Sequence, residues 1–440
     1  MRIDHLELEN FKNYAHLVLD FVPGVNLFIG SNGSGKTTIL EAVNVAVAGF
    51  FGSQEQKMQR VIEFEEIRVS RGKRESAATI KASSNIINGE WVRTIKRDTK
   101  TNDTKNLKTA SEYGKRILDA IETTNNKIIA PLIAYYSTQR LFKDSKITEK
   151  QKYDVAAGRR NGYLQCLKEN AIKGILNEWL GNAVTRRATL RIKDIESTDL
   201  VLENVEQAIR LCLLHFMNLS KDFSLKIYQD PDFDFELFIN FDNEHNFPFS
   251  YYSDGFRNIV YMIIDMVWRA SQLNPWLNLT SLSQQINGVV TIDEVDLHLH
   301  PKWQAKALAL LQLLFPNVQF FITTHSPTIV ANFDEREDES ENPIDTLYIL
   351  EGNDVKKISN SFYGQDVNSI LDNPMDADPR AEKVLNLFKN FDDIAGNPSS
   401  QSEDYKSLLQ IADELNDILP GTDEDLIRIN EIAERVKDTN

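Results

Sequence analysis

"FIGSNGSGKTTIL", residues 28–40, is the stretch that decides the fold. From Gly30 to Thr37 it follows the pattern G-x-x-x-x-G-K-[ST] of a phosphate-binding loop. An apolar segment precedes it and helix-forming residues follow it, which is the strand–loop–helix context that the pattern requires. In such loops, backbone N–H groups surround the phosphates, while Lys36 reaches the β- and γ-phosphates and Thr37 ligates Mg²⁺. The predicted nucleotide contacts are Gly30, Asn32, Gly33, Gly35, Lys36, Thr37 and Thr38.

A second stretch, "GVVTIDE" at 288–294, reads as a buried strand that ends in two acids. Ligands of open α/β sheets bind at the carboxyl ends of the strands, so Asp293 and Glu294 are predicted to face the nucleotide. We expect Asp293 to hold Mg²⁺ and Glu294 to act as the general base toward the attacking water. Alone, such a strand end is typical of solvated acids, and the phosphate loop is what favours the catalytic interpretation.

Two further strand ends carry polar residues that suit the same site. "FFITTHSP" places His325 just after an apolar strand, where it is predicted to contact the γ-phosphate and the attacking water. "YYSTQRLF" places Gln139 after another strand, where it is predicted to sense Mg²⁺ and the γ-phosphate. The alternatives are a core histidine that caps its strand and a solvated loop glutamine.

The turn "SDGFR", residues 253–257, opens a long run of helix formers. The first backbone N–H groups of a helix lack partners and favour anions, so this turn is a second predicted phosphate site. Ser253, Asp254 and Gly255 are the predicted contacts. Because Asp254 is itself an anion, we expect it to point away from the phosphate, toward Arg257.

Composition narrows the class of protein. The 440 residues are 42% hydrophobic and 26% charged, which is ordinary for a globular chain of two or three domains. Apolar runs stay well short of the roughly 18 residues of a membrane span, and the start does not resemble a signal peptide. Two cysteines, Cys166 and Cys212, are too few for a disulfide framework or zinc site, so we expect buried thiols and a cytoplasmic protein.

Charge is spread unevenly. The net charge is −16, of which residues 361–440 contribute −11, whereas residues 68–120 carry +7. This favours a local basic face and an acidic appendage over a general nucleic-acid coat. Apolar strands that alternate with helices predict an α/β fold whose main sheet is largely parallel.

Four regions follow from these patterns. Residues 1–145 form a first lobe with the phosphate loop and a β insert, and 146–225 a helical insert. Residues 226–360 form the lobe with the turn, the acidic strand and His325, and 361–440 an acidic helical appendage for assembly or partner docking. Residues 1–30 are predicted to hold three strands, and the helical pattern of the insert is predicted to include residues 164–180.

Two shorter motifs suggest metal chemistry, but each has a better explanation. "LHLHP" offers His298 and His300, yet a third zinc ligand is not evident nearby. "LYILEGND", 347–354, resembles the start of a TOPRIM nuclease domain with Glu351 as a ligand, but no D-x-D on a buried strand follows. A turn that joins two edge strands is the better interpretation.

In this order, the phosphate loop, SDGFR turn, acidic strand and late histidine resemble ABC-type ATPases, and more narrowly their SMC/RecF/OLD branch. The opening "IDHLELENFKNY" is similar to that branch's first strand, which implies that Lys12 and Asn13 lie near the nucleotide. "DEVDLHLHPKWQ" is similar to its acidic strand and D-loop, which implies a subunit-crossing role for Asp296. The resemblance implies an ATPase head with mixed antiparallel and parallel sheets, with ATP and Mg²⁺ as cofactors.

A narrower resemblance rests on "YYSTQRLF", "GRRNGYLQCL", "SDGFRN", "DEVDLHLHP" and the tail from "FYGQDVNSILDNP" onward. These segments look like the ATPase subunit of Septu-type anti-phage systems, which is also found with some retrons. The resemblance implies a dimer or higher homo-oligomer and a separately encoded HNH-type nuclease partner. The chain's short insert departs from the long coiled coils of the wider branch.

Two functions remain open from the sequence. The first is a head-to-tail ATPase dimer that regulates a nuclease in phage defence. The second is a RecF-like, ATP-dependent DNA-binding repair factor, in which the basic segment and Arg186, Arg187, Arg191 and Lys193 would meet phosphates. A transporter ATPase is disfavoured because the chain lacks a membrane segment and starts like the SMC branch.

Overall fold

The computed structural model describes residues 1–52, 60–103, 105–123, 127–141, 155–168, 172–193, 199–217, 224–229, 235–240, 246–358, 362–372, 374–375, 380–396 and 402–439. The chain divides into two compact units, Met1–Ile370 and Leu371–Asn440. The boundary between the two units lies after Ile370, whereas the appendage was predicted to start at residue 361. The reason is that residues 362–370 pack on the first unit, where Gly364 donates to the Ala331 carbonyl (2.8 Å) and Ile370 is fully buried.

The main sheet of the described residues has six strands in the order β16-β15-β3-β14-β13-β9. All of these strands except β16 run parallel. At one edge, β16 pairs with β15 as an antiparallel hairpin. These parallel strands consist almost wholly of buried residues, as predicted from their apolar runs. Their bounds are β3 Val25–Gly30, β9 Leu132–Tyr136, β13 Gly288–Ile292, β14 Val318–Thr323, β15 Thr346–Glu351 and β16 Asp354–Ile358.

A second, antiparallel sheet is built largely from the first hundred residues and, with β3, confirms the three strands predicted within residues 1–30. Its order is β2-β1-β6-β7-β8. Alternating burial along β6 shows one face toward the core and one toward solvent. The bounds are β1 His5–Phe11, β2 Tyr14–Asp20, β6 Ala77–Ser84, β7 Gly89–Lys96 and β8 Asn102–Asp103, beside the small pair β4 Val69–Ser70 and β5 Lys73–Arg74.

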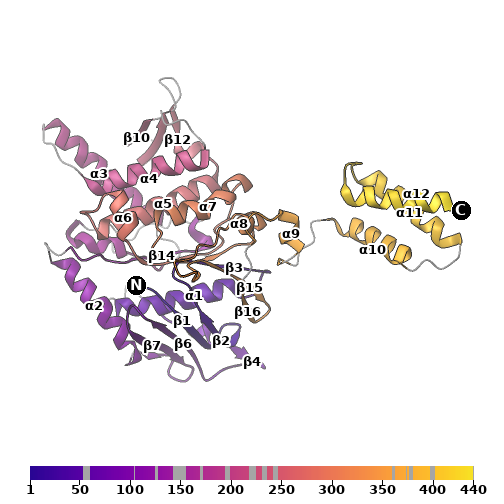
Figure 1. Ribbon diagram of the computed structural model, residues 1–440. Helices are drawn as coiled ribbons and strands as arrows, with labels where there is room; N and C mark the ends of the chain where they lie inside the picture. The colour runs from indigo at the N-terminus through magenta and orange to yellow at the C-terminus, as the bar shows by residue number, and fades with distance from the viewer. Residues whose placement is uncertain are drawn as a thin grey trace. The chain divides into compact units, whose positions relative to one another are not determined.

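Helix α1 (Lys36–Val47) lies between the two sheets (Figure 1). Ten of its twelve residues are buried, and the Trp91 indole of β7 donates to the Ala46 carbonyl at 2.9 Å. The helix that starts at the phosphate loop is therefore the centre of the N-terminal core. This burial fixes the loop before it.

Helices cover the other side of the main sheet, where α5 packs against β9 and α4 (Figure 1). The long helix predicted after the SDGFR turn is α5, Asp254–Leu273. The other bounds are α2 Lys108–Glu122, α3 Ile172–Ile192, α4 Leu200–Met217, α6 Leu279–Gln285, α7 Pro301–Leu314 and α8 Pro327–Ala331, with a small sheet of β10 Ser224–Gln229, β11 Phe235–Asn240 and β12 Asn246–Pro248.

The helical insert starts differently from the prediction. Residues Val155–Tyr163 form 3-10 turns, and regular helix begins only at Ile172 rather than near 164. The cause is a tertiary hydrogen bond, because the Cys166 carbonyl accepts the Tyr135 N–H at 2.8 Å and so extends the edge of the main sheet. Sequence periodicity does not register such a bond.

The second unit has its own small core of helices, α10 Glu382–Gly396, α11 Ser402–Ile418 and α12 Glu424–Thr439. Phe391, Leu415, Leu426 and Ile429 are fully buried in it. Arg380 binds Asp423 and Asp425 and thereby ties the start of this unit to α12. The short α9 (Val367–Asp372) spans the boundary between the units.

The described residues confirm the predicted α/β class, with one largely parallel sheet, one antiparallel sheet and a helical C-terminal unit. None of the described helices has both the length and the apolar character that a membrane crossing requires.

Candidate nucleotide-binding site

The phosphate loop joins the end of β3 to α1 and has the conformation its glycines allow. Gly35 adopts φ +98°, and a Cβ there would lie only 2.4 Å from the Tyr14 hydroxyl. That hydroxyl donates to the Ser34 carbonyl at 3.2 Å and so holds the loop from the neighbouring β2. Only glycine tolerates both the backbone angle and this close approach.

Lys36 lies folded into the loop rather than in solvent. Its ammonium donates to the carbonyls of Gly30 (2.8 Å) and Ser31 (2.9 Å), and the residue is 6% exposed. Burial lowers the pKa of Lys36, although the nearby carboxylates of Asp293, Glu294 and Asp296 counteract this effect. A bound phosphate would give this desolvated cation a stronger partner than two neutral carbonyls.

The acidic strand meets the phosphate loop at the edge predicted from sequence. Thr37 donates its hydroxyl to the Asp293 carboxylate at 3.0 Å, and Thr323 donates to the same carboxylate at 2.6 Å. Thr323 also accepts the backbone N–H of Glu294 at 2.7 Å, in a tight turn where Glu294 has φ +48°. The start of α1 and the ends of β13 and β14 are thereby linked by hydrogen bonds.

This donor set suits a hard divalent cation. A hydroxyl and a carboxylate converge beside the phosphate loop, and oxygen ligands of this kind are the ones that Mg²⁺ prefers. Thr37 and Asp293 would hold the ion, which would supply positive charge to neutralise the phosphates. Asp293 itself is 3% exposed, so its charge is fixed in place before any ligand arrives.

His325 follows β14, as predicted, and is half-buried. Burial and the cation of Lys36 lower the pKa of His325, so the imidazole is neutral at neutral pH and can accept a proton or a hydrogen bond. Asp296 lies beside it, because its carboxylate accepts from the Thr324 hydroxyl (2.5 Å) and the His325 N–H (3.4 Å). The residue predicted to cross to a second subunit therefore supports the His325 turn within its own chain.

A cavity of about 340 Å³ opens over the loop, and Lys12 and Asn13 line it as the resemblance implied. The Lys12 ammonium is held by the Glu41 and Glu66 carboxylates, the latter at 3.3 Å. The other lining residues are Gly33, Gly35, Lys36, Thr37 and Thr38. Sequence reasoning missed the supporting groups Tyr14, Glu41, Glu66 and Thr323. Glu41 and Glu66 lie outside the quoted motifs, and Tyr14 and Thr323 lie inside them but were given no role.

Two of the predicted site residues, Gln139 and Asn32, are exposed. Gln139 follows β9, the strand next to β13, and its N–H donates to Ser137, but its side chain is exposed and contacts neither Thr37 nor Asp293 among the described residues. Asn32 is exposed on the loop. Both lie at the correct edge of the sheet, and their predicted roles stay predictions.

The SDGFR turn has the local geometry predicted for it. Asp254 forms an ion pair with Arg257 one turn along α5, as expected for an acid that points away from a phosphate. Ser253 is exposed, and within the described chain it caps none of the α5 N–H groups. Gly255 is packed so tightly that a Cβ would lie 1.9 Å from the His298 carbonyl oxygen. The turn is thus seated against the segment that follows Asp296.

The alternative metal motifs are accounted for without a metal. His300 caps α7, where its Nδ1 accepts the Lys302 N–H at 3.2 Å. Glu351 ends β15 and binds Lys356 across the hairpin at 2.5 Å. The prediction of two edge strands was wrong for β15, because β16 forms this edge of the sheet and β15 lies inside it. Cys166 and Cys212 are free and buried, as expected, and burial raises the pKa of the Cys166 thiol to about 12.

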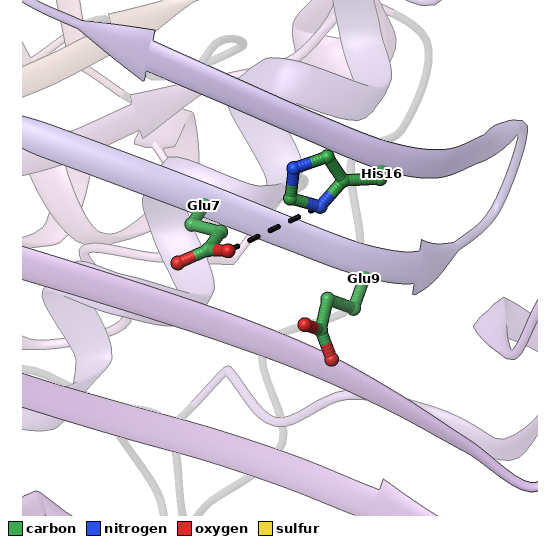
Figure 2. A group of neighbouring side chains, drawn as sticks. All are labelled: Glu7, Glu9 and His16. Carbon is green, nitrogen blue, oxygen red and sulfur yellow. Dashed lines mark ion pairs between the residues drawn. The ribbon is translucent and has the colours of Figure 1, made fainter.

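Glu7, Glu9 and His16 are the one group of three potential metal ligands found among the described residues (Figure 2). Glu7 and Glu9 share a face of β1, and His16 on β2 stands opposite Glu9. The His16 Nδ1 lies 4.0 Å from Glu7, whose other oxygen is 3.8 Å from the Lys81 ammonium. With Glu9 and His16 exposed and a lysine already at Glu7, the group is explained as a solvated sheet face.

Two family models match this chain. One, described as an AAA domain, matches residues 5–213. The other, described as an AAA domain, putative AbiEii toxin, Type IV TA system, matches residues 185–331. Together they cover the phosphate loop, the SDGFR turn, the acidic strand and His325.

Curated relatives align over most of the chain. The Retron Vc95 probable ATPase of Vibrio cholerae is 22% identical over 90% of this chain and 83% of its own length. The Septu protein PtuA of Bacillus thuringiensis is 25% identical over 74% of this chain and 72% of its own. The DNA replication and repair protein RecF of Lactococcus lactis is 24% identical, over 53% of this chain and 68% of its own.

Among solved structures, the Smc head bound to the C-winged helix domain of ScpA covers 82% of this chain and 98% of its own, at 16% identity and a TM-score of 0.45. The motif order, the two family models and the curated ATPase relatives agree. This chain carries an ATPase domain of the AAA/ABC type and is an ATP-hydrolysing enzyme.

Proposed function

We propose that ATP and Mg²⁺ bind over the phosphate loop and that the chain hydrolyses ATP there. Lys36 holds the β- and γ-phosphates, while Thr37 and Asp293 hold the magnesium ion, which neutralises charge on the phosphates. Glu294 takes the proton of the attacking water, and neutral His325 orients that water against the γ-phosphate. The observation that carries the proposal is the hydrogen-bond network of the Thr37, Asp293 and Thr323 side chains with the Glu294 backbone N–H, which joins the start of α1 to the ends of β13 and β14.

We further propose that the site is completed by a second copy of the chain. Ser253 and Asp254 are exposed, Asp254 is turned toward Arg257, and within the described chain the Ser253 side chain caps none of the first N–H groups of α5. We propose that these N–H groups receive an anion. In a head-to-tail pair, the turn of one subunit covers the γ-phosphate held by the other. Two such sites form, because the pair is symmetric.

The third part of the proposal is that this ATPase dimer regulates a separate HNH-type nuclease in anti-phage defence. Support comes from the extent of the similarity, because the retron and Septu relatives align over 74% or more of this chain, whereas the RecF relative aligns over 53%. The C-terminal unit, with its separate core and acidic surface, is the proposed docking or assembly element.

Purification of the chain alone tests this role. We expect ATP hydrolysis without DNA cleavage, and cleavage only when an HNH-type subunit encoded next to this chain is added. Omission of ATP, and Lys36→Ala in place of the natural chain, serve as controls for the ATP dependence of that cleavage. Robust metal-dependent cleavage by the chain alone would contradict the proposal.

The RecF-like alternative makes a different prediction, which is ATP-dependent DNA binding with a steep salt dependence. The structure weakens one part of it. Arg187 is engaged by Glu206 through two hydrogen bonds, at 2.7 and 2.9 Å, and Arg93 of the basic segment is buried in the core. Measurement of DNA affinity between about 50 and 200 mM salt, with and without ATP, separates the two functions.

A further inference from the structure

Tyr136, the last residue of β9, contacts two parts of the proposed composite site at once. Its backbone carbonyl accepts the N–H of Asp293 at 2.8 Å. Its hydroxyl donates to the Asp265 carboxylate of α5, also at 2.8 Å. One residue thus joins the proposed magnesium ligand to the helix that begins at the SDGFR turn.

The contact on α5 is a buried charge pair. Arg269 donates to the same Asp265 oxygen at 2.7 Å, and the two side chains are only 2% and 1% exposed. Arg269 also donates to the carbonyls of Gly162 (3.1 Å) and Leu164 (2.9 Å). Burial and the Asp265 charge raise the pKa of Tyr136, so its hydroxyl stays protonated and remains a donor. Among the described residues the other Asp265 oxygen is buried without a hydrogen-bond partner, so the carboxylate is held through one oxygen by Tyr136 and Arg269.

The position of Asp265 on α5 connects the Tyr136 contact to the SDGFR turn. Asp265 lies 12 residues after Ser253 on one continuous helix, which corresponds to about 18 Å along its axis. The segment before α3 is pressed onto the same helix, since a Cβ at Gly162 would lie 2.5 Å from the Leu273 side chain. A small shift of α5 at Asp265 therefore moves the exposed turn at its N-terminus.

We propose that Tyr136 is a positioning residue that sets the placement of α5, and so of the SDGFR turn, relative to Asp293. This inference rests on the composite site proposed above. The Tyr136 hydroxyl is buried and donates to Asp265, and its proposed role is to make the magnesium side and the covering side of the site move as one body. Loss of the hydroxyl loosens this coupling without removing a ligand of the nucleotide.

Tyr136→Phe tests the inference, because it deletes one oxygen and keeps the ring. Tyr348→Phe is the matched control: Tyr348 is equally buried in the same sheet, and its hydroxyl donates to the Asp20 carbonyl at 2.7 Å, away from α5. Thermal unfolding of both variants shows that each is folded. We expect Tyr136→Phe to bind a fluorescent ATP analogue within about twofold of the natural chain, while kcat falls about tenfold. Tyr348→Phe keeps kcat within about twofold of the natural chain.

A second readout does not depend on turnover. In the Glu294→Gln background, ATP-driven dimer formation measured by light scattering should need more protein for Tyr136→Phe than for Tyr348→Phe. Equal kcat and equal dimer formation for the two tyrosine variants would overturn the inference. If Glu294→Gln alone does not dimerise with ATP, the composite-site proposal fails instead, and the kcat comparison alone then decides the role of Tyr136.

Discussion

The phosphate loop and the SDGFR turn are both proposed anion sites at helix N-termini, but their surroundings differ. The loop is held on every side: Tyr14 fixes the Ser34 carbonyl, Lys36 fills its centre, and Thr37 is tied to Asp293. The turn is exposed at Ser253 and Asp254, whereas Gly255 and Phe256 are buried behind them. The proposed catalytic partners of the loop belong to its own chain. The turn packs against the His298 backbone through Gly255 and exposes Ser253 to solvent.

This difference is consistent with the two proposed phosphate sites having separate roles. A site built to bind nucleotide in the monomer needs buried, prearranged partners, and the loop has them. A site that covers a nucleotide bound to another subunit needs a well-packed helix start and an exposed surface. The turn has both, at Gly255 and at Ser253. The comparison predicts that damage to the loop removes binding, while damage to the turn removes hydrolysis and spares binding.

The largest expected effect is at Lys36. Lys36→Ala removes the desolvated cation from the centre of the loop, so ATP affinity should fall by about a hundredfold and hydrolysis should be lost. Titration with a fluorescent ATP analogue measures the affinity. Lys356→Ala is the control, since that lysine is exposed and binds only Glu351 across a hairpin. ATP affinity that survives Lys36→Ala would break the assignment of the loop.

Glu294→Gln separates chemistry from binding. The amide keeps the shape but cannot take a proton, so hydrolysis should fall by about a hundredfold or more while ATP affinity stays the same. Phosphate release measures the rate, with Glu351→Gln as the control at an exposed carboxylate. Normal turnover by the Glu294→Gln variant would show that another group is the base.

Gly255→Ala tests the packing of the turn against the His298 backbone. The added Cβ would lie 1.9 Å from the His298 carbonyl oxygen, so α5 or the segment after Asp296 must shift. We expect about a tenfold loss of hydrolysis with ATP affinity unchanged. Gly421→Ala, which has open space around its Cβ, is the matched control. A loss of ATP affinity in the Gly255→Ala variant would place the turn in its own subunit's pocket.

Much of the site was predictable because its residues stand at strand ends. Parallel strands bring their carboxyl ends to one edge, so Asp293 and His325 follow strands that end beside the phosphate loop, and Thr37 at the start of α1 reaches Asp293 although it lies far away in sequence. The ion pair of Asp254 with Arg257 was likewise predictable, from their spacing of three on a helix.

What sequence reasoning missed are groups defined only by tertiary contact. Tyr14 and Thr323 lie in motifs but act through contacts with other elements, and the buried pair Asp265–Arg269 contacts Tyr136 and Gly162 outside its own helix. The late start of α3 has the same origin, since a sheet-edge hydrogen bond from Cys166 overrides the local helical periodicity. Such contacts depend on the fold as a whole and leave no mark in spacing.

The smallest expected effect is the pH dependence contributed by His325. Its pKa is lowered in the folded chain, so the unfolded chain binds a proton more readily. The stability that this group contributes is present above the ordinary histidine pKa of 6.5 and is lost as the pH falls from there toward the lowered value. Urea unfolding at about pH 7.5 and about pH 5.5 should show a smaller pH difference for His325→Gln than for the natural chain. An unchanged difference would show that His325 is not desolvated.

The most direct test of the central claim is light scattering of Glu294→Gln with and without Ser253→Arg, in the presence of ATP and Mg²⁺. Ser253→Arg puts a bulky side chain on the outward face of the turn and leaves the phosphate loop untouched. We predict that Glu294→Gln forms an ATP-dependent dimer and that the double variant stays monomeric while it binds ATP with unchanged affinity. An ATP-dependent dimer of the double variant, or a loss of ATP binding by its monomer, would contradict the account.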